Sequence, residues 1–203
     1  MRLSDRGPEY YTIQSPGADD ERRILQAIPA IGDLPDGVKA QAVTAWHTVW
    51  RSSSHARLDQ LPYSLDAPSY SLVQHTMDVV SAGRVLERFA SDRWGCAVDS
   101  SQLLATLILH DVDKPLLYSW QDGKITLSAA GRDIPHGVLG GMLLQQLGVD
   151  PAVVGPVATH AVYSPWHGTS VIAWLLHYAD FFCADHVMRA EGQRPFYQPK
   201  PHV

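Results

Sequence analysis

Apolar residues recur every three or four positions through most of the chain, which is the spacing of side chains on one face of an α-helix. In one long run of this kind, from about Tyr70 to Ala90, Leu72, Met77 and Leu86 lie on the apolar face. The same period predicts helices over residues 19–28, 34–50, 70–90, 100–111, 135–148, 150–163 and 169–192. An all-α helical bundle is therefore the expected fold.

One segment departs from the helical period. In LLYSWQDGKITLS, apolar and polar residues alternate on either side of Asp122-Gly123. Asp-Gly is a preferred pair for the tight turn of a β-hairpin, because both positions need positive φ angles. We therefore expect a small β-hairpin near residues 117–128 within the helical fold.

The ends of the chain and one internal segment lack a regular period. Residues 1–18 are polar, the segment 57–69 (RLDQLPYSLDAPS) carries two prolines, and RPFYQPKPHV at the C-terminus carries three. The predicted organisation is one globular unit in three parts. These parts are an N-terminal helical extension over residues 1–68, a helical core domain over 69–192, and a Pro-rich tail over 193–203.

Composition narrows the class of protein. The 203 residues are 45% apolar and 18% charged, with a net charge of −5, so a sizeable core is expected and a nucleic-acid partner is not. The two cysteines, Cys96 and Cys183, are too few for a thiolate zinc cluster or a disulfide framework. The first residues lack the apolar core of a secretory signal, and no apolar run reaches the ~20 residues of a membrane span. A cytoplasmic location is expected.

Several polar residues interrupt or end the predicted apolar helices. They are four histidines and two aspartates: His75, His110, Asp111, His136, His160 and Asp180. Taken singly, each histidine could be a packed core residue with a backbone partner. A buried carboxylate is harder to accommodate without a compensating partner. Together, imidazoles and carboxylates form a ligand set suited to divalent metal ions.

The order His, His-Asp, His, His, Asp, with separations of 35, 26, 24 and 20 residues, resembles the HD superfamily of metal-dependent phosphohydrolases. The resemblance covers residues 69–192 and implies a helical HD domain. Matched by position, it implies that His75, His110, Asp111 and Asp180 are the metal ligands shared by the superfamily. His136 and His160 match the additional histidines of its two-metal members.

The stretch HDVDK resembles the HDxGK motif of several branches of the superfamily. Lys114 occupies the position of a lysine that contacts an anionic group of the substrate, so Asp111 and Lys114 are the candidate catalytic residues. The other interpretation of Lys114 is a solvated surface lysine. Asp113 stands where the motif has glycine, and its carboxylate is expected either to orient Lys114 or to face water.

The resemblance implies hydrolysis of a small phosphorylated metabolite or nucleotide by a metal-activated water. The expected cofactor is two divalent ions, drawn from Mn, Fe, Zn, Ni, Co and Mg. A di-iron oxygenase similar to myo-inositol oxygenase uses the same ligand order, and a non-catalytic binding module is a further alternative. The signature of cyclic-di-GMP phosphodiesterases is missing, since Thr159 precedes His160 and no Gly-Tyr-Pro follows. The expected partner is a small anionic substrate, and a homodimer is compatible with the sequence.

Three further residues near the predicted ligands have a structural and a functional interpretation. His177, three residues before Asp180, either orients a ligand or is simply packed, and packing is favoured. His167 and Arg132 could reach a substrate, but both are expected to face solvent.

Overall fold

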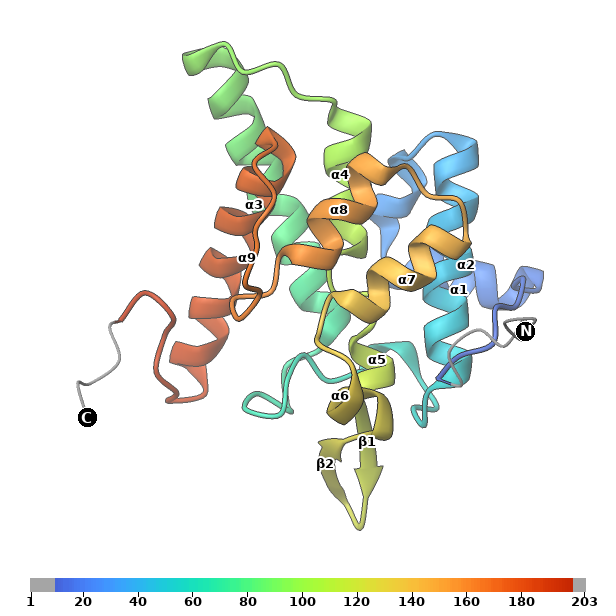
Figure 1. Cartoon of the computed structure of the whole chain (residues 1–203). Helices are drawn as coiled ribbons and strands as arrows, with labels where there is room; N and C mark the ends of the chain where they lie inside the picture. The colour runs from blue at the N-terminus through green and yellow to red at the C-terminus, as the bar shows by residue number, and fades with distance from the viewer. Residues whose placement is uncertain (1–9, 199–203) are drawn as a thin grey trace, which may run out of the picture.

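The computed structural model describes residues 10–198 and consists mainly of helices, with one short hairpin, as the sequence predicts (Figure 1). Its elements, in chain order, are α1 (Ala18–Ala27), η1 (Pro29–Asp33), α2 (Asp36–Ser52), η2 (Leu58–Gln60), α3 (Leu72–Trp94), α4 (Ser100–Leu109), α5 (Lys114–Leu117), β1 (Tyr118–Gln121), β2 (Lys124–Leu127), α6 (Ala129–Asp133), α7 (Val138–Gln146), α8 (Pro151–Thr159) and α9 (Val171–Ala190). The 3₁₀ turns η1 and η2 and the short helices α5 and α6 are not predicted by the hydrophobic period.

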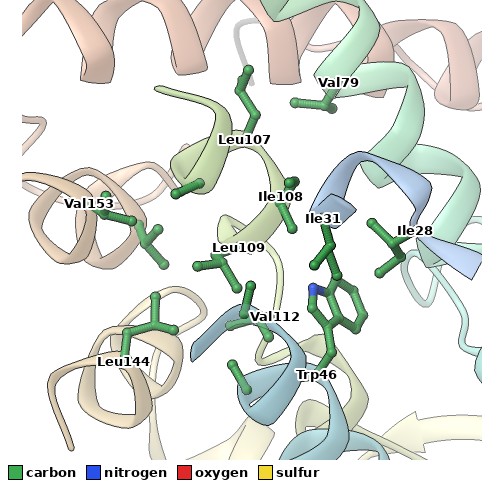
Figure 2. Packing of buried hydrophobic residues seen from close by; sticks show 14 of the residues in the cluster. Ile28, Ile31, Trp46, Val79, Leu107, Ile108, Leu109, Val112, Leu144 and Val153 are labelled. Atoms are coloured by element: carbon green, nitrogen blue, oxygen red, sulfur yellow. The ribbon is translucent and has the colours of Figure 1, made fainter. Parts of the chain in front are cut away.

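Helix α4 forms the centre of the bundle. Every residue from Leu103 to Leu109 is buried, so this helix is apolar on all sides and is covered all round. Helices α3, α8 and α9 pack against it, as do η1 and α2. Figure 2 shows Leu107, Ile108 and Leu109 between side chains of these neighbours, including Trp46 of α2. The residues that directly follow α4 therefore lie in the interior of the protein.

Polar side chains fix the first turns of the helices that lead to or from the centre. Asp99 accepts hydrogen bonds from the backbone N–H groups of Ser101 and Gln102 at the start of α4, both at 3.0 Å. Asp150 accepts one from Ala152 at the start of α8, where Pro151 is the first helical residue as predicted. Such caps satisfy amide groups that have no partner within the helix.

Several predicted helix boundaries are wrong, and α8, for example, ends at Thr159 and not at Tyr163. Helix α3 continues one turn beyond Ala90 to Trp94 and is followed by Gly95, whose φ of 66° is the left-handed conformation typical of a helix C-terminus. Helix α7 begins at Val138 and not near Pro135, because Gly137 has a φ of 84° and interrupts the helical path. A Cβ atom at Gly137 would lie 2.8 Å from the Val157 carbonyl oxygen, so α7 and α8 approach closely there.

The predicted hairpin is confirmed. Strands β1 and β2 pair in antiparallel register, from Tyr118 opposite Leu127 to Gln121 opposite Lys124. Asp122 and Gly123 both have positive φ, at 51° and 75°, as a two-residue turn of this kind requires. In Figure 1 the hairpin projects from the helical body beside α5 and α6.

The segment between α2 and α3 is less irregular than its prolines suggest. Residues Leu58–Gln60 form η2, and an isolated bridge pairs Pro62 with Ser71. Backbone hydrogen bonds from Leu72 N to Leu61 O and from Tyr63 N to Tyr70 O close the segment into a fixed loop. This loop holds the Tyr63 side chain in a buried position beside α3.

Within residues 10–198, no helix combines the length and apolar character that crossing a membrane requires. Of the predicted tail, residues 193–198 are described and residues 199–203 lie outside the described part. Phe196 packs against Phe181 of α9, with ring centroids 5.4 Å apart, so the first part of the tail lies against the last helix.

Candidate metal centre

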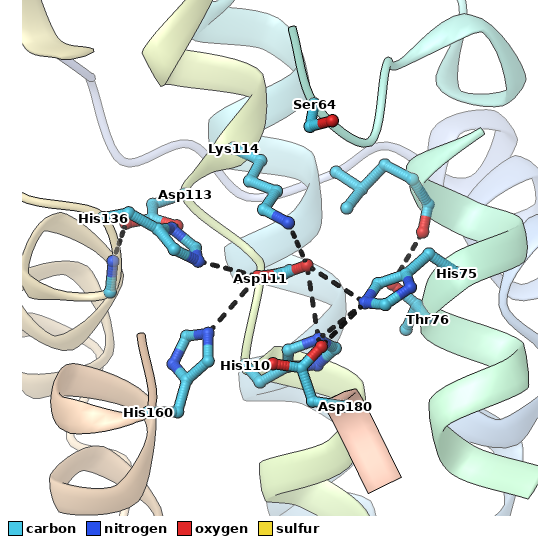
Figure 3. Close-up of polar contacts among 12 residues, drawn as sticks. Ser64, His75, Thr76, His110, Asp111, Asp113, Lys114, His136, His160 and Asp180 are labelled. Carbon is cyan, nitrogen blue, oxygen red and sulfur yellow. Dashed lines mark hydrogen bonds and ion pairs between the residues drawn. The ribbon is translucent and has the colours of Figure 1, made fainter. Parts of the chain in front are cut away.

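The structure brings the six predicted ligands together from positions far apart in the sequence. His75 comes from the first turn of α3, His110 and Asp111 follow the last residue of α4, and Asp180 lies in α9. His160 follows the last residue of α8. His136 precedes α7. Figure 3 shows Asp111 at the middle of the cluster, with two histidines on one side and the remaining three ligands on the other.

The donor atoms form two groups of three. His75, His110 and Asp180 make the first group, and Asp111, His136 and His160 make the second. Within each group the donor atoms lie within 4.8 Å of one another. We call these the first and second tripods. Either group could hold a metal ion.

The separations of the donor atoms within the tripods suit a first-row divalent ion. A metal–ligand bond of ~2.1 Å places neighbouring donors roughly 3.0 Å apart in an octahedral site and roughly 3.4 Å apart in a tetrahedral one. In the first tripod, His75 Nε2 lies 3.1 Å from Asp180 Oδ1 and 3.4 Å from His110 Nε2. In the second, Asp111 Oδ1 lies 2.9 Å from His136 Nε2 and 3.4 Å from His160 Nε2. The residues present therefore fit a metal ion, and the remaining separations within each tripod are no longer than 4.8 Å.

Asp111 faces both tripods. Its Oδ1 belongs to the second tripod, while its Oδ2 lies 3.4 Å from His75 Nε2 and 3.3 Å from His110 Nε2 of the first. The side chain is 1% exposed. A carboxylate with one oxygen directed at each of two donor groups is the arrangement that bridges two ions.

Three of the four imidazoles are held so that Nε2 faces the cluster. The Nδ1–H of His110 donates to the Leu107 carbonyl at 2.8 Å, and that of His160 donates to the Val157 carbonyl at 2.7 Å. His136 Nδ1 lies 2.9 Å from Asp113 Oδ1. When a neutral imidazole carries its proton at Nδ1, Nε2 is the nitrogen that offers a lone pair to a metal ion. For His75, no hydrogen-bond partner of Nδ1 occurs among the described residues, and its ring lies against Tyr63 at 4.1 Å.

Asp113 neither orients Lys114 nor faces water, so both expectations for this residue are wrong. Its side chain is fully buried, and Oδ2 accepts hydrogen bonds from the backbone N–H of Gly137 at 2.7 Å and of Gly140 at 3.3 Å. With the bond to His136, the carboxylate accepts three hydrogen bonds and caps the start of α7. Asp113 thereby fixes the helix that presents His136.

Lys114 is buried, so its interpretation as a surface lysine is wrong. Its Nζ lies 2.6 Å from Asp111 Oδ2, as an ion pair without the alignment of a hydrogen bond, and 3.8 Å from the centre of the Tyr63 ring. The side chain is only 8% exposed. A positive charge thus lies directly beside the carboxylate that joins the two tripods.

Burial and neighbouring charges shift the pKa values of several residues in the cluster. Burial alone would raise the pKa of Asp111, but the adjacent His110 and Lys114 charges outweigh it and hold that pKa well below its usual range. Burial would likewise lower the pKa of His136, but Asp113 and Asp111 raise it to about 10. For His75 burial dominates, and its pKa is lowered. Burial thus favours the neutral form of His75, which is the form that binds a metal ion.

The sequence did not reveal the roles of Tyr63 and Asp113. Tyr63 lies in a proline-containing loop with no motif, and its contacts with His75 and Lys114 arise from the fold of that loop. Asp113 was visible only as a departure from the HDxGK motif. The other three candidates have simpler environments: Arg132 is exposed and donates to the Leu127 carbonyl, and His177 stacks on Phe181 at 4.5 Å. His167 is exposed, and its ring lies 5.9 Å from that of His177.

Comparison of the chain with protein-family models, with curated proteins and with solved structures finds no match. The mostly helical fold and the buried His/Asp cluster are compatible with an HD-like metal site.

Proposed function

We propose that this protein is a metal-dependent phosphohydrolase that acts on small phosphoesters at the two tripods. The observation that carries the proposal is the sharing of Asp111 between two buried donor groups, with the Lys114 ammonium beside it. Two divalent transition-metal ions held there would lower the pKa of a bound water and polarise a phosphoryl oxygen.

The residues of the chain have distinct tasks in this proposal. His75, His110 and Asp180 would hold the first ion, His136 and His160 would hold the second, and Asp111 would contribute to both sites. The hydrogen bonds at Nδ1 of His110, His136 and His160 keep the three rings in place, so little reorganisation is needed when an ion binds. This preorganisation favours a high affinity for metal ions at the two tripods.

Lys114 supplies a fixed positive charge to the substrate. Burial would lower its pKa, but Asp111 and other nearby groups raise it above the usual value, so the ammonium stays charged at neutral pH. The Tyr63 ring supports it from one side. Negative charge that develops on the phosphoryl oxygens during cleavage of the ester P–O bond would be stabilised by this ammonium. In the net reaction, the water oxygen joins phosphorus and the leaving alcohol takes up a proton.

The proposal is tested by elemental analysis of protein purified without added metal, combined with phosphate release from a panel of phosphoesters. His110→Ala should lose the metal of the first tripod and reduce phosphate release by at least about 100-fold, because it deletes a ligand. His186→Ala is the matched control, since His186 is exposed on α9 and belongs to neither tripod. Metal-replete protein that releases no phosphate but consumes dioxygen with iron bound would replace the proposal with oxygenase chemistry.

A further inference from the structure

A small cavity adjoins the second tripod on the side of α9. It has a volume of about 250 Å³ and lies between the end of α8, the start of α9 and residues of the connecting segment. His160 lines it, and the same residue offers its Nε2 to the second tripod. The cavity is thus one residue away from the candidate metal centre. A second hollow of about 480 Å³, near the end of α9 and the tail, is lined by none of the site residues.

The walls of this cavity are mostly rings. Trp174 and Tyr178 lie one turn apart on α9, and His177 lies between them in sequence, with His167 from the connecting segment facing it. Flat side chains favour flat ligands, because stacked and edge-to-face ring pairs gain ~0.5–1.5 kcal/mol beyond the area that they bury. The lining therefore favours a ligand that contains a flat ring.

Two of these rings contact further rings outside the cavity. Trp174 lies against Trp94 of α3 at 5.7 Å and meets Tyr178 edge-on at 6.2 Å. His177 stacks on Phe181 at 4.5 Å with an interplanar angle of 29°. Trp174 and His177 are thus each supported by a ring outside the cavity, so less free energy is lost in ordering these two side chains when a ligand binds.

The volume limits the size of the group that fits. A cavity of ~150 Å³ accommodates benzene, and pockets for whole drug-sized ligands begin near ~300 Å³. About 250 Å³ therefore suits a single substituted ring or a small bicyclic ring as one part of a larger substrate.

We propose that this cavity binds the alcohol part of the substrate and that this part carries a flat ring. The proposal rests on the proposed function, since the phosphoryl group would lie at the tripods while the ring occupies the space between Trp174, Tyr178 and the two imidazoles. Thr159 and the imidazoles add polar groups to the lining, which can face polar atoms of such a ring.

The test measures equilibrium binding of phosphonates, which are not hydrolysed, to the full-length protein loaded with Mn²⁺. Calorimetry compares methylphosphonate, benzylphosphonate and cyclohexylmethylphosphonate. We expect benzylphosphonate to bind at least about tenfold more tightly than methylphosphonate and at least about threefold more tightly than the puckered cyclohexyl compound. Equal affinities for the two ring compounds would overturn the assignment of a flat ring.

Variants of the cavity residues test whether these residues cause the preference for benzylphosphonate over methylphosphonate. Trp174→Ala and Tyr178→Ala should each bring the affinities for benzylphosphonate and methylphosphonate to within about threefold of each other, while Trp174→Phe, which keeps a flat ring, should retain most of the difference. Phe182→Ala is the matched control, because Phe182 is an exposed aromatic residue of α9 that does not line the cavity. A preference that survives both alanine variants overturns the subsite.

Binding and turnover separate the two proposals. Protein that prefers benzylphosphonate through Trp174 but releases phosphate from no ester would reject the phosphohydrolase and keep the subsite. Protein that hydrolyses esters but binds benzylphosphonate and methylphosphonate equally would keep the phosphohydrolase and reject the subsite.

Discussion

Replacing the buried carboxylate of Asp113 should weaken the second tripod selectively. In Asp113→Asn, the side-chain oxygen can still accept from the N–H groups of Gly137 and Gly140, but the amide nitrogen then faces His136 Nδ1. His136 must accept at Nδ1 and carry its proton on Nε2, the atom that faces Asp111 at 2.9 Å. A protonated Nε2 has no lone pair for a metal ion.

The opposite orientation of the introduced side-chain amide does not relieve the problem, because its NH₂ group would then meet the Gly137 N–H at 2.7 Å, donor against donor. One unsatisfied buried donor costs ~1–3 kcal/mol. Loss of a hydrogen bond that orients a metal-binding histidine typically lowers metal affinity by about 10- to 100-fold. We expect this loss at the second tripod, with the affinity of the first tripod unchanged within about twofold.

Asp113→Gly, which supplies the residue of the HDxGK motif, should be more severe. It leaves all three donors without their acceptor and opens the start of α7, so an unfolding free energy lower by about 3–5 kcal/mol is expected.

The assay is equilibrium dialysis against Mn²⁺ with elemental analysis, together with nitrogen NMR of the His136 tautomer and thermal unfolding of the metal-free protein. Asp92→Asn, on the exposed end of α3, is the control. Two full metal equivalents bound by Asp113→Asn with wild-type affinity would refute the reasoning.

Three further predictions concern other parts of the molecule. Lys114→Ala leaves Asp111 without its ion pair, so it should destabilise the metal-free protein by ~3–5 kcal/mol in thermal unfolding and the Mn²⁺-loaded protein by clearly less. Turnover of an anionic substrate should fall ~10²- to 10³-fold. Equal destabilisation of the metal-free and Mn²⁺-loaded forms would contradict the placement of the Lys114 charge beside Asp111. Arg51 and His47 lower the pKa of Asp20, so the stability that Asp20 contributes is present above its unfolded pKa of about 3.9 and is lost as the pH falls through the lower folded value. The difference in unfolding free energy between the wild type and Asp20→Asn should accordingly shrink below about pH 4, whereas Asp19→Asn, at an exposed pair with Arg22, should show little difference at any pH. Gly83→Ala places a Cβ 2.4 Å from Leu107 Cδ1 in the core and should cost ~1–3 kcal/mol in denaturant unfolding, while Gly37→Ala in α2, with open space around it, should not destabilise.

The helices and the hairpin could be predicted because their signals are local. The apolar period of residues 70–90 and the Asp122-Gly123 turn depend only on neighbours in sequence, and both elements are present. Helices α5 and α6 have four and five residues, which is little more than one turn, so they contain no period to detect. The start of α7 depends on Gly137 and on the distant Asp113 carboxylate.

The composition of the candidate site could be predicted, but not its internal arrangement. His110 and Asp111 follow an apolar run, and Asp180 interrupts one. Each can therefore be recognised in the sequence as a polar group whose burial costs free energy. The contacts of Asp113 with His136 and of Tyr63 with Lys114 span 23 and 51 residues and leave no mark in the sequence. The same holds for His47, which had no predicted role and is buried against Asp20 of α1.

The long chain separation of the donors within one tripod has a thermodynamic consequence. His75 and Asp180 lie 105 residues apart yet only 3.1 Å from each other in space, so the first tripod does not exist in the unfolded chain. An ion bound there would act as a reversible cross-link between α3 and α9, and its binding free energy would be added to that of folding. At a free metal concentration about 1,000 times the dissociation constant, this linkage is worth ~4.1 kcal/mol. The heat resistance of this protein should therefore follow the supply of metal in its surroundings.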